Sequence, residues 1–342
     1  MHQLPVRWVL PVVGALVGAI LAGVLIGPGH LPWRGVMGAL IDRLPFISVD
    51  HGLTRLQHDV LFQIRLPRVV LGGMVGAMLA SGGAAYQGVF RNPLADPYLL
   101  GVAAGAGLGA TLAIVYGPST SGWIISPLPL FAFAGAVVAV WLTYLLGAGG
   151  SGGRSNTNII LAGVAVAAFF TAAQTYVQQA NSDDLRSVYS WMLGGLNTSG
   201  WSEVRLVLPY LVISSGMLMM HRRALDVLRV GEVEAAALGM RADRVRLTVV
   251  IASTLGVAAA VSVSGLIGFV GIVVPHTVRL TAGSSYRRVL PLSLALGAAF
   301  LIATDVLART IVAPAELPIG VITAFCGAPF FVVVLRHRRA GT

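Results

Sequence analysis

The side chains that could bind a nucleotide in this sequence lie in one glycine-rich stretch, residues 149–155. A phosphate-binding loop of the Walker type needs a first glycine, a second glycine five residues later and then a lysine. Here Ala148 stands at the first glycine position and Arg154 at the lysine position. The chain contains no lysine, because all 23 of its basic residues are arginines. We therefore expect no ATP binding of this type by the chain itself, and we interpret the stretch as a turn.

A second polar segment, residues 91–102, places Asn92 and Asp96 beside two prolines, between two apolar runs. Proline fixes the backbone of a turn, and Asn and Asp side chains accept hydrogen bonds from the first backbone N–H groups of a helix. We expect a stiff turn in which Asn92 and Asp96 cap helix ends.

A third segment, residues 231–240, is the one most suited to contact with another protein. Glu232 and Glu234 precede three alanines and Gly239. Acids near the start and a glycine at the end favour a short helix. The segment lies among arginines, and we predict that it docks a partner protein.

Metal chemistry has no support in the sequence, and we expect no bound metal or cofactor. The one cysteine, Cys326, stands in an apolar run and is predicted to be a small core residue. The seven histidines are scattered.

The elements that position these segments are membrane spans. Hydrophobic residues make up 56% of the 342 and charged residues 11%, against about 25% charged in a soluble domain. Crossing a bilayer as a helix takes roughly 18 to 20 apolar residues. The candidate runs are residues 8–26, 69–86, 99–116, 128–146, 159–177, 206–220, 247–263, 265–278, 290–307 and 320–335. We predict an all-α membrane protein of about ten transmembrane helices, folded as one domain over residues 1–342.

The net charge of +10 predicts the orientation of these spans. If the N-terminus is cytoplasmic, 15 of the 23 arginines and five of the 13 acids fall in inner segments, so the excess positive charge lies inside. This asymmetry is the usual orientation signal of membrane proteins. It predicts cytoplasmic termini and contact with membrane lipid, and it explains the high pI without nucleic-acid binding.

Four motifs, taken in order, resemble the permease subunits of type II ABC importers, which take up iron–siderophores, haem and cobalamin. The motifs are residues 91–102, 231–240, 265–276 and 315–323, the last followed by Gly-Ala-Pro at 327–329. The resemblance implies a homodimer in the bacterial cytoplasmic membrane, with a pore along the dimer axis. It also implies two cytoplasmic ATPases, which bind the ATP and Mg, and an outer substrate-binding protein.

The resemblance also implies roles for particular residues. A cytoplasmic coupling loop, residues 222–246, would contact the ATPase through Glu232, Glu234, Ala235, Ala236 and Gly239. The alternative is an ordinary solvated loop helix.

On the outer side, Arg65, Arg68 and Arg309 would pair with carboxylates of the binding protein. Asp305 lies four residues before Arg309, on the same helix face, so we expect it to satisfy Arg309 in part. Snorkelling or local pairing is the alternative role for all three arginines.

The fifth span would line the pore, through Asn156 and Thr157 at its inner end and Thr171, Gln174 and Gln178 in its outer half. Hydrogen bonding between helices is the rival explanation for these polar groups.

The sequence thus predicts a non-enzymatic permease subunit that moves a metal chelate by alternating access. Iron–siderophore is the first expectation for the cargo, haem the second and cobalamin the third. The alternative is an ion-coupled secondary transporter, which requires an ionisable residue near mid-membrane. Asp305 is the only acid beside a span core.

Overall fold

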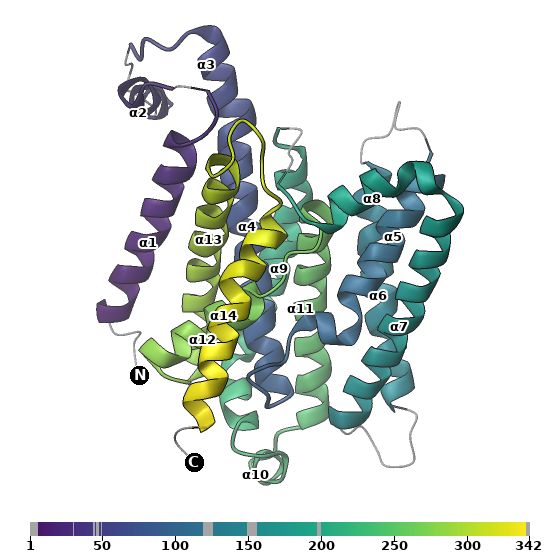
Figure 1. Cartoon of the computed structure of the whole chain (residues 1–342). Helices are drawn as coiled ribbons and strands as arrows, with labels where there is room; N and C mark the ends of the chain where they lie inside the picture. Colours follow the sequence, from purple (N-terminus) through teal and green to yellow (C-terminus); the bar gives the residue numbers. More distant parts are fainter. Residues whose placement is uncertain are drawn as a thin grey trace.

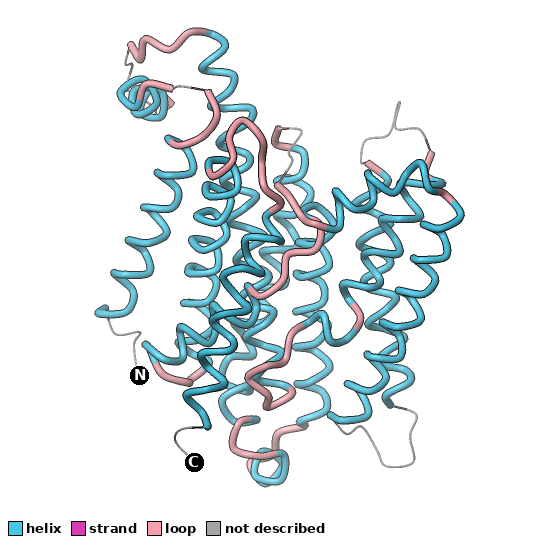
Figure 2. Tube along the Cα trace, in the orientation of Figure 1, coloured by secondary structure: helices cyan, strands magenta, loops and turns pink. Residues whose placement is uncertain are grey.

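The computed structural model describes residues 6–339 except 30, 44, 46–47, 49, 119–125, 149–155 and 197–199. The described chain consists of helices and loops, with no strand among these residues (Figure 2). An apolar chain in lipid must satisfy its backbone groups internally, and helices do so within one segment.

Within the part of the chain that the structure describes, ten apolar helices form the bundle. Seven are long and apolar enough to cross a membrane, and three are shorter. Their bounds are α1 Val6–Leu25, α4 Leu66–Val89, α5 Val102–Tyr116, α6 Pro127–Ala148, α7 Asn156–Ala180, α9 Ser202–Leu228, α11 Ala242–Ser264, α12 Val270–Ala282, α13 Tyr286–Thr310 and α14 Ile319–Arg339. The predicted number and order of spans agree with this architecture.

Seven short helical segments of the described chain connect or cover the bundle. They are α2 Trp33–Asp42, α3 Arg55–Asp59, η1 Val60–Arg65, η2 Pro97–Leu100, η3 Ser182–Asp184, α8 Leu185–Met192 and α10 Glu232–Ala237. Figure 1 shows that α2, α3 and α8 lie at one end of the bundle. At the other end α1 begins, α14 ends and α10 protrudes.

The predicted span at residues 265–278 is wrong at its start. Gly265 and Phe269 have positive φ angles of 68° and 67°, and α12 begins only at Val270. The residues between α11 and α12 therefore form a non-helical break, which leaves α12 only 13 residues long.

The core centres on α4, which packs against α13, α11, α9 and α12. Lipid supplies little hydrophobic driving force between helices, so close backbone approach has to stabilise the bundle. A Cβ atom on Gly76 of α4 would overlap the carbonyl oxygen of Gly297 on α13, and Gly105 of α5 meets Gly135 of α6 in the same way. These glycines allow helices to touch where any larger residue would separate them.

Candidate functional site

Arg65 lies at the end of the bundle that carries α2 and α8, and it caps the C-terminus of α1. Its two Nη atoms donate hydrogen bonds to the carbonyl oxygens of Val24 and Leu25 at 3.0 and 3.1 Å, and of Gly27 and Pro28 at 3.1 and 3.0 Å. The last carbonyls of a helix lack partners and carry a partial negative charge, so a guanidinium group stabilises them. Arg65 is 3% exposed, and it fixes the position at which α1 ends.

A four-member ionic network joins α4 to α13 and to the loop before α14. Asp305 lies between Arg68 and Arg309. Its Oδ1 is 2.9 Å from Arg68 Nη2, and its Oδ2 is 2.9 Å from Arg309 Nε. Arg68 also donates to both carboxylate oxygens of Glu316, at 3.0 and 2.8 Å. The expected pairing of Arg309 with Asp305 is confirmed. The network as a whole carries two positive and two negative charges.

These contacts bear on the predicted docking role of the three arginines. Arg65 and Arg309 are buried, and the donors of their guanidinium groups point to atoms of the chain itself, which include the Gly23 carbonyl at 3.2 Å from Arg309. The Arg68 side chain is 12% exposed, and its partner Glu316 is 37% exposed. Local pairing, the alternative stated for these arginines, is therefore present at all three positions. Docking stays a prediction, and Arg68 is the one of the three with solvent access.

The opposite end of the bundle carries the exposed helix α10. Ala235 is fully buried, whereas the neighbouring side chains Glu234 and Ala236 are exposed. Gly239 has a φ of +77° and ends the helical segment, as predicted for a glycine stop. The side chain of Glu232 lies outside the described residues.

Two apolar side chains of this end were not singled out from the sequence. Val233 is 81% exposed and Leu238 is 74% exposed, on either side of the buried Ala235. The sequence signal that could have indicated these exposed apolar side chains is the alternation of glutamate and apolar residues at 232–235. Exposed apolar side chains grouped at a helix of this kind suit contact with another protein.

The end of α9, which leads into α10, is tied to the turn between α12 and α13. Asp226 accepts hydrogen bonds from the backbone N–H of Tyr286 at 2.6 Å and from the Ser285 hydroxyl at 2.8 Å. Arg229 donates to the carbonyl oxygen of Ser284 at 2.6 Å. These three hydrogen bonds hold the end of α9 against the start of α13. Sequence reasoning missed this contact, because nothing local relates residues so far apart in the chain.

The predicted capping role of Asp96 is confirmed. Its Oδ1 accepts the backbone N–H of Tyr98 at 2.8 Å and caps η2. The hydroxyl of Tyr98 in turn donates to the Ile267 carbonyl at 3.0 Å, inside the non-helical break before α12. The segment at residues 91–102 therefore holds that break in place.

The polar residues predicted to line a pore lie along α7, but they differ in surroundings. Thr157 and Thr171 are exposed, and Gln178 is partly buried. Gln174 is 5% exposed and donates to the sulfur of Met192, the last residue of α8, at 3.1 Å. Gln178 Nε2 also donates to the Met192 sulfur, at 3.8 Å. Interhelical contact, the stated rival, is therefore present at Gln174 and Gln178, and pore lining stays a prediction. The side chain of Asn156 lies outside the described residues.

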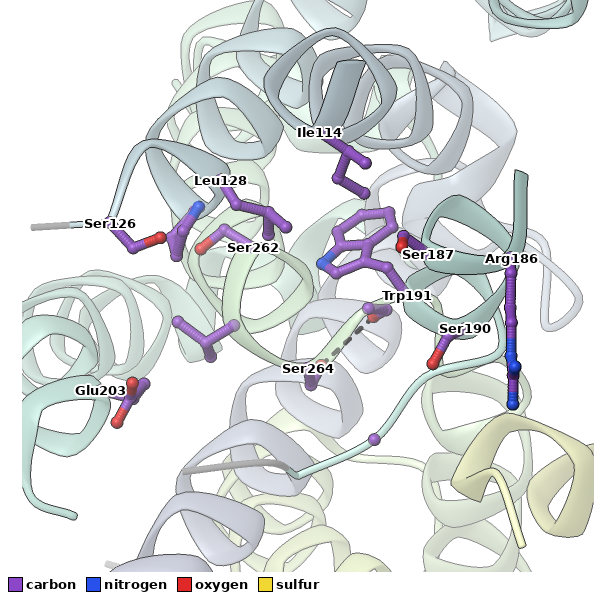
Figure 3. Close-up of a pocket in the computed structure, with 14 residues that line it drawn as sticks. Ile114, Ser126, Leu128, Arg186, Ser187, Ser190, Trp191, Glu203, Ser262 and Ser264 are labelled. Carbon is purple, nitrogen blue, oxygen red and sulfur yellow. Dashed lines mark hydrogen bonds between the residues drawn. The ribbon is translucent and has the colours of Figure 1, made fainter. Parts of the chain in front are cut away.

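Next to α8 lies a cavity of about 590 Å³ between α5, α6, α9 and α11. Figure 3 shows the Trp191 ring in its middle, with Ser262 and Ser264 of α11 nearby and Glu203 of α9 farther away. Ser262 and Ser264 donate their hydroxyl hydrogens to backbone carbonyls of α11. A second cleft, of about 350 Å³, lies against α8 and the start of α14, and Arg186, Ser190 and Gly195 line both spaces. The helix α8 thus lies between two polar spaces.

Cys326 is exposed on α14 and is not the core residue expected from the sequence. The helix α14 packs against α12 and α13, and its first residues, Ile319 and Gly320, are hydrogen-bonded to Gly194 and Leu193. An apolar run in the sequence does not by itself indicate which face of the helix packs against neighbouring helices.

Seven long apolar helices, three shorter ones and buried ion pairs at one end define a multi-pass, all-helical membrane protein. Residues 15–337 match the FecCD transport family, and the chain belongs to that family.

Named relatives place the family among permeases. The chain is 40% identical over 326 residues to the cobalamin import system permease protein BtuC of Halobacterium salinarum, covering 95% of this chain and 85% of the relative. It is 34% identical over 325 residues to the Fe(3+) dicitrate transport system permease protein FecD of Escherichia coli, covering 95% and 96%. A solved structure described as an inward-facing conformation of a putative metal-chelate type ABC transporter superposes with a TM-score of 0.79. It is 31% identical, over 96% of this chain and 98% of the other.

Proposed function

We propose that this chain is the transmembrane permease subunit of an ATP-driven importer for a metal chelate in a bacterial cytoplasmic membrane. The observation that carries the proposal is the family match over residues 15–337, together with a bundle of ten apolar helices that presents the exposed short helix α10 at one end. The sequence lacks any lysine for a Walker loop. This supports a separate subunit as the site of ATP and Mg binding.

The assembly proposed is two copies of this chain, two cytoplasmic ATPases and an outer substrate-binding protein. Residues 222–246 are the coupling loop in a single permease domain of residues 1–342, with Glu234, Ala236 and Gly239 on its exposed surface. Both termini are cytoplasmic in this proposal. Support comes from α1 beginning and α14 ending at the end of the bundle that carries α10 (Figure 1), and from the arginines concentrated there.

Transport by such an assembly requires alternating access to the pore. A ligand shifts a conformational equilibrium only by its difference in affinity for the two states. The loaded binding protein acts at the end of the bundle that carries α8. ATP acts through the ATPases at the opposite end, which carries α10. Asp226 and Arg229 connect the α9–α10 end to α13, whose other end holds Asp305 and Arg309. Helix α13 therefore offers a rigid connection between the two faces.

The cargo proposed is a metal chelate: iron–siderophore first, haem second and cobalamin third. The relatives named for cobalamin and for iron(III) dicitrate have comparable identity to this chain, so identity does not rank the cargoes. ATPase activity of the reconstituted complex, stimulated by one loaded binding protein at a time, identifies the cargo.

Co-purification tests the proposal directly. A tagged chain, expressed with its neighbouring genes and extracted in mild detergent, is expected to retain a cytoplasmic ATPase in a one-to-one ratio. A chain that retains no ATPase and takes up substrate on an ion gradient contradicts it, and supports the secondary transporter. In the structure Asp305 is engaged by two arginines, which does not favour that alternative.

A further inference from the structure

We infer that the cleft between α8 and the start of α14 is a binding subsite for a carboxylate of a small-molecule anion, with Arg186 as its principal cation. The inference deepens the proposed function and rests on it for the biological role of the site. The cleft has a volume of about 350 Å³ and lies at the end of the bundle opposite α10.

The charge balance of the cleft singles out Arg186. Arg68 lines the same cleft, but its charge is compensated by Asp305 and Glu316 within the four-member network. Arg186 is exposed, and among the residues that the structure describes it has no hydrogen-bond or ion-pair partner. Figure 3 shows its side chain extending away from Trp191, toward the α14 part of the chain. The cleft therefore keeps one uncompensated positive charge.

Two hydroxyl groups stand beside this charge. Tyr189 and Ser190 follow Arg186 by three and four residues on α8, a spacing that puts all three side chains on one helix face, and all three line the cleft. A guanidinium fork binds a carboxylate through two parallel hydrogen bonds. The hydroxyls supply further donors for a carboxylate or an alcohol group of the same ligand.

Two backbone carbonyl groups of the cleft, those of Leu193 and Gly194, already have hydrogen-bond partners. The carbonyl oxygens of Gly194 and Leu193 accept the N–H groups of Ile319 and Gly320, both at 3.1 Å. Apart from Glu316, which Arg68 holds, each polar side chain among the described residues of the cleft carries a hydrogen-bond donor, and the Tyr189 and Ser190 hydroxyls can also accept. Such a set suits an anion and disfavours a cation. Arg186 and Ser190 also line the 590 Å³ cavity next to α8.

Cysteine reactivity tests the subsite without depending on transport. The variant carries Cys326→Ser, which removes this chain's one native thiol, and Ser190→Cys, one turn from Arg186. The full-length chain is reconstituted alone in lipid nanodiscs. The probes are an anionic sulfonatoethyl and a cationic trimethylammonioethyl methanethiosulfonate. Adding Arg186→Gln is expected to lower the anionic-to-cationic rate ratio about tenfold at low ionic strength. Arg205→Gln, an exposed arginine near the start of α9 outside both spaces, is the matched control and leaves the ratio unchanged.

The second part of the experiment measures whether a bound ligand protects the introduced thiol from modification. Millimolar ferric citrate is expected to slow modification at least about threefold when Arg186 is present, and not in R186Q, whereas a neutral ferric hydroxamate chelate protects less. A rate ratio independent of Arg186, or equal protection by both chelates, overturns the inference. Protection that depends on the binding protein alone also overturns it, because the carboxylate then comes from that protein. The thiol reaction needs no ATP, so a failed co-purification leaves this result intact and the two claims fail separately.

Discussion

Arg68 and Asp305 are 237 residues apart in the sequence, yet Arg68 Nη2 lies 2.9 Å from Asp305 Oδ1 in a nearly buried pair. Asp305 is also bound by Arg309 on its own helix. One carboxylate therefore joins α4 to α13 at the end of the bundle where α1 is capped by Arg65. The stability of this end depends on a few charges that lie away from water.

Replacing Asp305 by Asn is the first test of that dependence. Two arginines then lose their shared counter-charge, and breaking a buried pair in this way costs about 3 kcal/mol. Thermal unfolding of the purified chain in detergent is expected to shift down markedly. Glu316→Gln is the matched control, since Glu316 is 37% exposed on its side chain and an exposed pair contributes about 1 kcal/mol at most. Equal shifts in both variants contradict the proposed dependence on burial.

Arg65→Gln removes the cap of α1. The five carbonyl oxygens of residues 24, 25, 27, 28 and 29 lose this donor. We expect a loss of about 2 kcal/mol, within the range for leaving buried polar groups unpaired. Hydrogen exchange should rise over the end of α1 and little elsewhere. Arg55→Gln, an exposed arginine of α3, controls for loss of charge. Unchanged exchange at residues 20–29 would show that Arg65 does not hold this helix end.

Glycine contacts between helices give a matched pair of variants. Gly76→Ala forces α4 and α13 apart, because the new Cβ overlaps the Gly297 carbonyl, and we expect destabilisation of about 2 kcal/mol. Gly14→Ala meets nothing within 4 Å. Since alanine favours a helix over glycine, it should stabilise by up to about 1 kcal/mol. Melting temperatures that move in the same direction contradict the assigned contact.

Glu234→Arg tests the coupling proposal. The residue is exposed on α10, so the variant should fold normally. Reversal of its charge is expected to reduce substrate-stimulated ATP hydrolysis and uptake at least about tenfold in proteoliposomes, because a charge reversed at a protein contact typically costs more than 1.4 kcal/mol. Asp42→Arg, an exposed acid at the other end of the bundle, serves as control. Normal uptake in E234R removes the residue from the coupling contact.

Docking of the binding protein is best tested at Arg68. Arg68→Glu should weaken association, with an effect that shrinks as salt is raised. Glu316→Gln, which frees Arg68 from its carboxylate partner, should strengthen association if Arg68 meets a partner carboxylate. Surface plasmon resonance with the permease in nanodiscs measures both. Loss of association in R68E together with no gain in E316Q indicates a structural role only.

The sequence by itself determined the class of the protein, the ten apolar helices and their order. These follow from hydropathy and charge asymmetry, which are local properties that a single chain displays directly. It also indicated the Asp96 cap and the Asp305–Arg309 pair, because both join residues within four positions of each other. The missing lysine fixed the absence of a Walker loop.

Only the tertiary structure decided what the arginines do. Arg65 was expected at an outer surface, and it is buried against the end of α1. Arg186 was not singled out, and it lines a cleft that two distant segments form, without a hydrogen-bond or ion-pair partner among the residues that the structure describes. Likewise, Gln174 contacts Met192 while Thr171 on the same helix is exposed. The physical reason is common to all of these: whether a polar group in a bundle is free or paired depends on neighbours from other helices, and helix periodicity alone does not specify them.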